Sequence, residues 1–252
     1  MADRVNEVTL KLAKFLLQEN GSINMFTISG FVAYLTLSLL NIGLRGPSKY
    51  QISDFLGCNF TFMEISEIKD IQEYGCSNLL KMDEFNDVGR TQTAIFHSIR
   101  ALEDFKQMAL ENYNIELIPV PRGSDLRHIT IINQWAKNRK DIPYGDTFIQ
   151  PFRDEISSLI IDDNYIRFNW EVSFREAWTS KGIFTNNNGK NIVVDTMILI
   201  EYLYYLDDNN TKASILFLPC DDYDTFSVIV LPHEETNLVA VLKRMKVPSI
   251  AN

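Results

Sequence analysis

The feature that most constrains this chain is a run of 22 residues without a charged side chain, INMFTISGFVAYLTLSLLNIGL, at positions 23–44. A membrane-spanning helix needs about 20 predominantly apolar residues. Polar and small residues interrupt this run at Asn24, Thr27, Ser29, Gly30, Thr36, Ser38 and Asn41. Because serine and glycine favour caps and turns over a helix interior, we expect a short strand over 23–28 and a helix over 31–42. The helix would start at a Ser29 N-cap and be buried on all sides, so no membrane partner is expected.

The N-terminal segment, MADRVNEVTLKLAKFLLQEN, has the pattern of an amphipathic helix over residues 3–18. Its apolar side chains are spaced by three and four positions, at Val5, Val8, Leu12, Phe15 and Leu16. A secretion signal instead has a basic start, an apolar core and a small-residue cleavage site. Charged residues are scattered through this segment, so we expect a cytoplasmic protein in preference to an extracellular one.

Charge and cysteine content narrow the class of partner. The chain has 24 basic and 33 acidic side chains, which gives a net charge of −9. Binding to phosphate backbones needs a net positive face, so nucleic acid is not an expected partner, whereas solubility or a basic partner is compatible with this charge. The cysteines at 58, 76 and 220 form neither a disulfide framework nor a Cys-x-x-C motif, which suits a reducing compartment.

Helical patterns dominate the first half of the chain and strand patterns the second. The expected helices cover residues 3–18, 31–42, 47–56, 63–81, 102–112, 126–140 and 237–246. The expected strands cover residues 90–99, 115–121, 157–174, 202–206, 213–219 and 226–232, with a hairpin over 182–198 that turns at Asn188-Gly189. No repeat, proline-rich linker or low-complexity tract marks a boundary. We therefore expect a single α+β domain over residues 1–252 rather than a βαβ repeat.

Five blocks, taken in order, make the chain similar to one family. The first, INMFTISGFVAYLTLSLLNIGLRGPSKYQISDFLG, resembles that family's strand, buried helix, small-residue turn and Gln-Ile helix. INQWAKNR (132–139) resembles its Ile-Asn-x-Trp helix, and NYIRFNWEVSF (164–174) resembles its Asn-to-Phe-to-Trp strand. IFTNNNGKNIVVDTM (183–197) resembles its Phe–Asn–Gly turn, and ASILFLPCDDYDTFSVIVLP (213–232) resembles its paired strands that each end in Leu-Pro. On these blocks, the sequence resembles the serpin superfamily of serine protease inhibitors.

The resemblance implies an α+β fold in which N-terminal helices pack on a large central mixed β-sheet, accompanied by smaller sheets. The helix that carries Trp135 would lie across the main sheet. Gly30 follows Ser29 where serpins place a proline, which is expected to loosen the helix start. The segment 168–170 is shorter than the family's strand ending, and DIPYGDTF replaces its Thr-x-Gly-Lys-Ile.

The largest departure concerns the reactive loop, which serpins carry far downstream of the paired Leu-Pro strands. Residues 1–252 extend one helix past Leu231-Pro232. We therefore expect them to lack the C-terminal third of the fold, with the reactive loop and its reactive-site bond. Because a serpin inhibits by inserting its cleaved loop into the main sheet together with the acylated protease, suicide inhibition is not expected of these residues alone.

The resemblance leaves two functions open. One is a shortened serpin, similar to those of poxviruses, that modulates host proteases or inflammation. The other is a non-inhibitory interaction or decoy protein that uses serpin-like surfaces, for which binding at an exposed strand edge is suited. In both cases the expected partner is a protein, either a host protease or a signalling protein.

No cluster of side chains predicts catalysis, a cofactor or a metal, so we expect no enzyme. No serine or cysteine has a G-x-S-x-G setting, and structural or solvated roles are expected for the histidines, His97, His128 and His233. The acidic clusters lack the ligand pattern of a calcium loop. They are expected to be solvated turns at Asp162-Asp163, Asp207-Asp208 and Asp221-Asp222-Asp224. Packing roles are expected for Trp135, Trp170 and Trp178, and Cys220 is not expected to be reactive beside an acidic turn.

Overall fold

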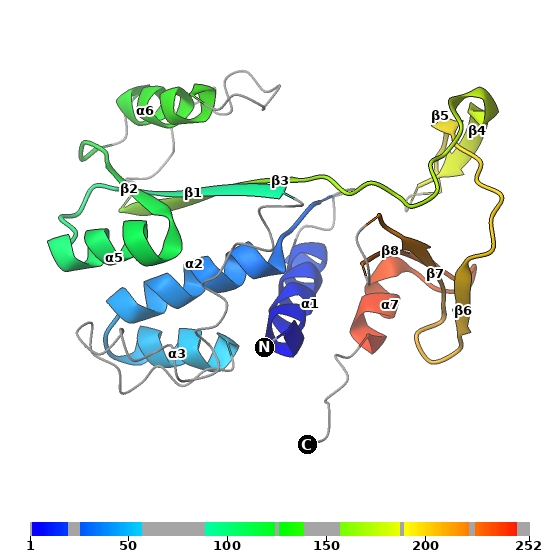
Figure 1. Ribbon diagram of the computed structural model, residues 1–252. Helices are drawn as coiled ribbons and strands as arrows, with labels where there is room; N and C mark the ends of the chain where they lie inside the picture. The colour runs from blue at the N-terminus through cyan, green and yellow to red at the C-terminus, as the bar shows by residue number, and fades with distance from the viewer. Residues whose placement is uncertain are drawn as a thin grey trace. The chain divides into compact units, whose positions relative to one another are not determined.

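The computed structural model describes residues 2–19, 26–56, 89–123, 126–138, 157–186, 189–221 and 225–245. The chain forms two compact units (Figure 1), one made of Met1–Phe31 with Ile166–Asn252 and the other of Val32–Tyr165. Within the described residues, the first unit holds strand hairpins and two helices, and the second holds a three-stranded sheet with helices on its faces.

Helix α2 (Gly30–Gly43) confirms the buried helix expected from the uncharged run. Every residue from 30 to 42 is buried or half-buried. A turn at Gly46, whose φ is +67°, leads into α3 (Pro47–Leu56). The amide nitrogen of Asn41 donates a 2.9 Å hydrogen bond to the Ser53 hydroxyl. Because a buried polar group needs such a partner, the polar residues of the run are compatible with a buried helix.

The short strand expected over residues 23–28 is wrong for the part that the structure describes. Residues 26–29 have no regular secondary structure and lead directly into α2, while 20–25 lie outside the described residues. An alternation of only a few residues does not by itself distinguish a strand from an extended approach to a helix cap.

The second unit is built around a three-stranded sheet of β1 (Gly89–His97), β2 (Ile115–Pro119) and β3 (Ser158–Ile166), in the order β2-β1-β3. Strands β1 and β2 are parallel, with Thr93 opposite Ile115. Helix α5 (Glu103–Tyr113) connects them, as a parallel pair requires a crossover.

Helices cover both faces of this sheet, as Figure 1 shows. On one face, a core of α2, α5 and sheet side chains gathers around Leu39, Ile95 and Met108. On the other face, α6 (Leu126–Lys137) contributes Ile132 to a core with Ala94 and Phe96. Successive residues of β1 therefore serve opposite cores, as the alternation of a strand dictates. The rings of Phe96 and Trp135 meet edge to face with centroids 5.5 Å apart, which confirms the expected position of the tryptophan-bearing helix on the main sheet.

The expected strand over 157–174 is correct only in its first half. Strand β3 ends at Ile166, and residues 167–169 have no regular structure. Beyond them Trp170 forms an isolated antiparallel bridge with Cys220, and the Asp221 amide donates to the Asn169 carbonyl oxygen over 3.0 Å. The apolar and aromatic pattern continues because Trp170 packs against Phe174, with ring centroids 4.8 Å apart, and that packing does not require a strand.

The first unit holds the remaining elements. Strands β4 (Ser180–Thr185) and β5 (Asn191–Thr196) form an antiparallel hairpin, as expected for the Asn-Gly turn. Strands β6 (Tyr204–Asp208), β7 (Ala213–Pro219) and β8 (Phe226–Pro232) form an antiparallel sheet in that order. Its helices are α1 (Ala2–Glu19) and α7 (Leu238–Arg244), which contact each other, and a 3-10 turn covers Glu176–Trp178. These elements confirm the expected order, while the helix expected over 63–81 and residues 139–140 lie outside the described residues.

Among the described residues, no helix combines the length and the apolar character needed to cross a membrane.

Candidate protein-binding surface

Large apolar side chains lie exposed along the strands of the first unit. On these strands and on the segment between β5 and β6, those with more than half of their surface exposed are Ile183, Phe184, Val193, Met197, Ile200, Tyr202, Tyr204, Tyr205, Ile229 and Leu231. Soluble monomers seldom expose large apolar patches unless the patch binds something. The strands of this unit are therefore the first place to look for a binding surface.

Strand β6 carries this exposure in its most concentrated form. Tyr204 is 76% exposed, Tyr205 62% and Leu206 50%. Successive residues of a strand point to opposite faces, so both faces of β6 are apolar and accessible. In the β6-β7-β8 sheet β6 is an edge strand: within the described residues it pairs only with β7, from Tyr204 opposite Phe217 to Asp208 opposite Ala213. We name residues Tyr202–Leu206 the tyrosine edge.

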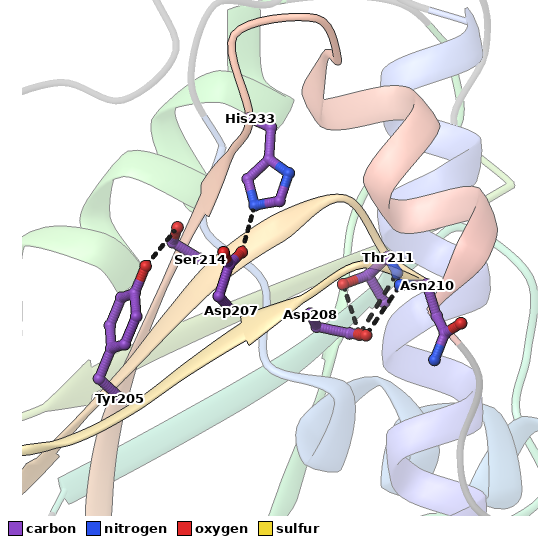
Figure 2. Close-up of polar contacts among 7 residues, drawn as sticks. All are labelled: Tyr205, Asp207, Asp208, Asn210, Thr211, Ser214 and His233. Carbon is purple, nitrogen blue, oxygen red and sulfur yellow. Dashed lines mark hydrogen bonds and ion pairs between the residues drawn. The ribbon is translucent and has the colours of Figure 1, made fainter.

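Polar contacts fix the C-terminal end of β6 to its neighbours (Figure 2). Oδ1 of Asp207 lies 2.7 Å from Nε2 of His233, which follows β8. The hydroxyls of Tyr205 and Ser214 share a 3.0 Å hydrogen bond between β6 and β7. These contacts join all three strands at one end of the sheet, so the edge is held in a defined register.

The β6–β7 turn is organised by Asp208. Its carboxylate accepts hydrogen bonds from the Thr211 hydroxyl (2.7 Å), the Asn210 amide (2.9 Å) and the Thr211 amide (3.3 Å). The Thr211 hydroxyl bond, followed by the Asn210 amide bond, lowers the pKa of Asp208. Lys212 completes the turn with a φ of 59°, a left-handed conformation that is uncommon for a residue other than glycine.

The expectation that the acidic pairs are solvated turns is wrong for two of them. Asp162 and Asp163 lie within β3, and Asp207 and Asp208 are the last residues of β6. Of the third cluster, Asp221 follows β7, whereas residues 222–224 lie outside the described residues. Strand pairing decides these placements, and acidic residues carry too weak a local preference to reveal it.

Asp162 has an unusual environment for a strand carboxylate. Its Oδ1 accepts hydrogen bonds from the hydroxyls of Thr93 (2.7 Å) and Thr36 (3.2 Å). Part of the side chain remains on the surface, yet partial burial raises the pKa of Asp162 while the two threonine bonds act in the opposite direction. A cavity of about 20 Å³ lined by both threonines and by Tyr113 lies in the same unit, a volume that suits a water molecule rather than an organic ligand.

The three histidines are held by single local contacts in different elements. Nδ1 of His97 lies 2.6 Å from the Ile99 carbonyl oxygen, and Nε2 of the fully buried His128 lies 2.5 Å from that of Pro121. His233 contacts Asp207, as described above. Within the part of the chain that the structure describes, no three potential ligands gather as a metal site would require.

The remaining singled-out residues lie in packed positions or in local ring contacts. Trp135 and Trp170 pack against phenylalanines as expected. The packing role expected for Trp178 is wrong, because this residue is 41% exposed and its ring centre lies 4.7 Å from the Arg175 guanidinium. Cys220 is buried, with its sulfur 3.5 Å from the Ser227 hydroxyl. The residues that sequence reasoning missed are those of the tyrosine edge. Their signal was three adjacent large apolar residues, Tyr204 to Leu206, in a strand that should alternate.

Comparison with known proteins extends this picture to the whole chain. The family model described as Serpin (serine protease inhibitor) matches residues 3–252. The chain is similar to intracellular coagulation inhibitor 2 of Tachypleus tridentatus, with 23% identity over 250 residues, which cover 98% of this chain and 60% of that protein. It is also similar to an uncharacterized serpin-like protein of Fowlpox virus (strain NVSL), with 24% identity over 210 residues, which cover 83% of this chain and 57% of that protein.

The fold agrees with these relatives. The crystal structure of human thyroxine-binding globulin complexed with its hormone superposes with a TM-score of 0.79 at 17% identity, covering 97% of this chain and 65% of that one. The chain thus spans about three fifths of the length of the curated relatives named above. The buried α2 behind a sheet, the Trp135 helix on that sheet and the paired strands that end in Leu-Pro agree with a family match that extends from residue 3 to residue 252, and the chain belongs to the serpin family.

Proposed function

We propose that residues 1–252 form a single serpin-like domain that binds a protein partner and does not act as a suicide inhibitor. The observation that carries this proposal is the tyrosine edge, an accessible apolar strand at the end of a sheet. Exposed strand edges pair readily with other chains, and proteins that do not use them usually protect them. An edge with adjacent exposed tyrosines is therefore best explained as a place of contact.

Inhibition by a serpin depends on a reactive loop that inserts into the main sheet. The serpin blocks recognised in residues 1–252 run to Leu231-Pro232 and do not include that loop. For these residues we therefore propose binding without covalent capture of a protease.

Protease inhibition is the second candidate. It is favoured by the similarity to a protein named as a coagulation inhibitor, which extends over 98% of this chain. Under this candidate the partner would be a serine protease, and the bound state would be covalent.

We further propose that the protein acts in the cytoplasm of a host cell, on a host protease or a signalling protein. The similarity to the Fowlpox virus protein supports a viral role. The net charge of −9 and the sparse cysteines of the chain are compatible with that location.

A denaturing gel separates the two candidates. The purified protein is incubated with trypsin, chymotrypsin and leukocyte elastase, and each mixture is analysed for a band of summed mass that survives denaturation. Binding without inhibition predicts no such band and full residual protease activity. A stable covalent band with any of these proteases, formed in proportion to lost activity, would replace the proposal with the inhibitor.

A further inference from the structure

The chemistry of the tyrosine edge indicates the kind of chain that it binds, and this inference rests on the proposed binding function. Strand β6 pairs with β7 on one side only, within the described residues. The open side of an edge strand offers backbone donors and acceptors to an added strand. The strand YYLDD (204–208) contains no proline or lysine, and its two charged residues, Asp207 and Asp208, lie at its C-terminal end.

The edge is held in register before any partner arrives. The Asp208 turn, the Tyr205–Ser214 hydrogen bond and the Asp207–His233 contact join β6 to β7 and to the end of β8. A preorganised strand loses less conformational freedom on binding than a mobile one. Tyrosine side chains, which are enriched among the residues that dominate binding energies, then stand on both faces of a fixed strand.

Charge selects the partner. Glu201 precedes the tyrosine edge and Asp207 and Asp208 follow it, and the segment EYLYYLDD contains no basic residue. Glu201 is exposed, and its carboxylate accepts a hydrogen bond from the Tyr202 amide over 3.0 Å. The net charge of −9 adds a long-range attraction for positively charged partners. Complementary charges at the rim of an interface set partner choice and approach rate, and the tyrosine faces also attract lysine and arginine.

The other edge of the sheet provides an internal comparison. Strand β8 also exposes apolar side chains, among them Val228 at 50%. Within the strand, FSVIVLP has no acidic residue and ends in a proline, which protects that end of the edge, whereas the exposed Glu234 and Glu235 follow it after His233. We propose that β6 adds an extended polypeptide segment in which basic and apolar residues alternate, as a fourth strand beside the tyrosine edge.

The test measures fluorescence anisotropy of a labelled peptide of alternating lysine and valine, titrated with the full chain. Three matched peptides accompany it: one with glutamate in place of lysine, one with serine in place of valine, and one with every backbone nitrogen methylated. The last keeps side chains and charge but has no backbone N–H on either edge, so it cannot form a strand ladder. We expect the lysine–valine peptide to bind, and each matched peptide to bind at least about tenfold more weakly.

Two variants place the site. Tyr204→Ser and Glu201→Gln change exposed side chains and leave the backbone of β6 in place. We expect each to weaken binding of the lysine–valine peptide by about three- to tenfold. Val228→Ser, at a 50% exposed position on β8, serves as the control and is expected to leave binding unchanged. Far-UV circular dichroism checks that all three variants keep the fold.

Every other outcome overturns the inference. Equal binding of the glutamate peptide removes charge selection, and equal binding of the methylated peptide removes strand addition. Loss of binding in Val228→Ser alone moves the site to β8. A concentration-dependent dimer that Tyr204→Ser abolishes, with no peptide binding, assigns the edge to a second copy of the chain. Failure here leaves the proposed function standing if no covalent protease band forms, whereas such a band refutes the proposed function whatever the peptides do.

Discussion

The hydroxyl of Thr93 on β1 donates a 2.7 Å hydrogen bond to Oδ1 of Asp162 on β3, and Thr36 of α2 donates to the same oxygen over 3.2 Å. One carboxylate thus links two strands and the buried helix of the second unit. Partial burial raises the pKa of Asp162, so the folded state holds its proton more tightly than the unfolded chain does.

The Asp162 link predicts a pH-dependent difference between the wild-type protein and Asp162→Asn. With a raised folded pKa, the contribution of Asp162 to stability is fully present below the ordinary value of about 3.9 and is lost as pH rises through the folded value. Asparagine can still accept from both threonines and does not ionise. We expect urea midpoints of the wild type to fall relative to the variant as pH rises from about 4 to 7. A difference that stays constant over this range would contradict the assignment.

Gly30 at the start of α2 lies against Thr9 of α1, so a larger residue at position 30 is expected to clash with α1. A Cβ added at Gly30 would lie 1.6 Å from the Thr9 hydroxyl oxygen and 2.7 Å from the Thr9 Cβ. Gly30→Ala should therefore lower the free energy of unfolding by about 1–3 kcal/mol, measured by chemical denaturation. Thr9→Ala in the same chain should recover part of the loss, because it removes the nearer atom. Equal losses in the single and double variants would show that Thr9 is not the obstacle.

Truncating Phe96 tests how much the packing of α6 on the main sheet contributes to stability. Its side chain is fully buried and meets Trp135 edge to face. Phe96→Ala should cost about 3–5 kcal/mol of stability through the cavity it leaves. Leu126→Ala, at a 64% exposed position at the start of the same helix, is the control and should change stability by less than about 0.5 kcal/mol. Similar losses for both would mean that α6 does not pack as described.

Removing the Asp208 carboxylate is expected to loosen the β6–β7 turn, because this carboxylate accepts hydrogen bonds from Asn210 and Thr211. Because the pKa of Asp208 is lowered by hydrogen bonds to its carboxylate, its contribution is present above the ordinary value of about 3.9 and is lost as pH falls through the folded value. Asp208→Ala should speed hydrogen exchange of the Asn210 and Thr211 amides, which donate to this carboxylate. Asp195→Ala, which removes an exposed ion pair with Lys181 on the β4–β5 hairpin, should leave those amides unchanged.

Much of the fold could be predicted because local signals and tertiary packing agree. The helix predicted from the uncharged run agrees with α2. Polar side chains of the run can be buried there because they have partners, such as the Asn41 side-chain amide nitrogen with the Ser53 hydroxyl. The Trp135 helix and the Leu-Pro strands follow from their apolar patterns. Gly30, at the position where serpins place a proline, is a case in which the sequence did not reveal the packing. Glycine there had been expected to loosen the helix start, whereas the structure places the Thr9 hydroxyl where a Cβ would stand, and only the packed fold reveals that contact.

The candidate site was less predictable. The sequence indicates that Tyr204 to Leu206 form a strand, but not that this strand lies at a sheet edge with both faces accessible. That depends on which strands pair, and pairing is a long-range property. Likewise, Asp207 was expected in a solvated turn because acidic residues favour turns, whereas pairing with β7 extends β6 through Asp208.

Strand addition beside β6 is tested most directly by backbone hydrogen exchange of the full chain with and without the lysine–valine peptide. An added strand beside β6 must bond the backbone groups on its open side. We expect slowed exchange confined to residues 202–208, with β8 and the β4–β5 hairpin unchanged, and loss of that protection in Tyr204→Ser. Protection centred on β8 or on the main sheet, or none at peptide concentrations that saturate the anisotropy signal, would contradict it.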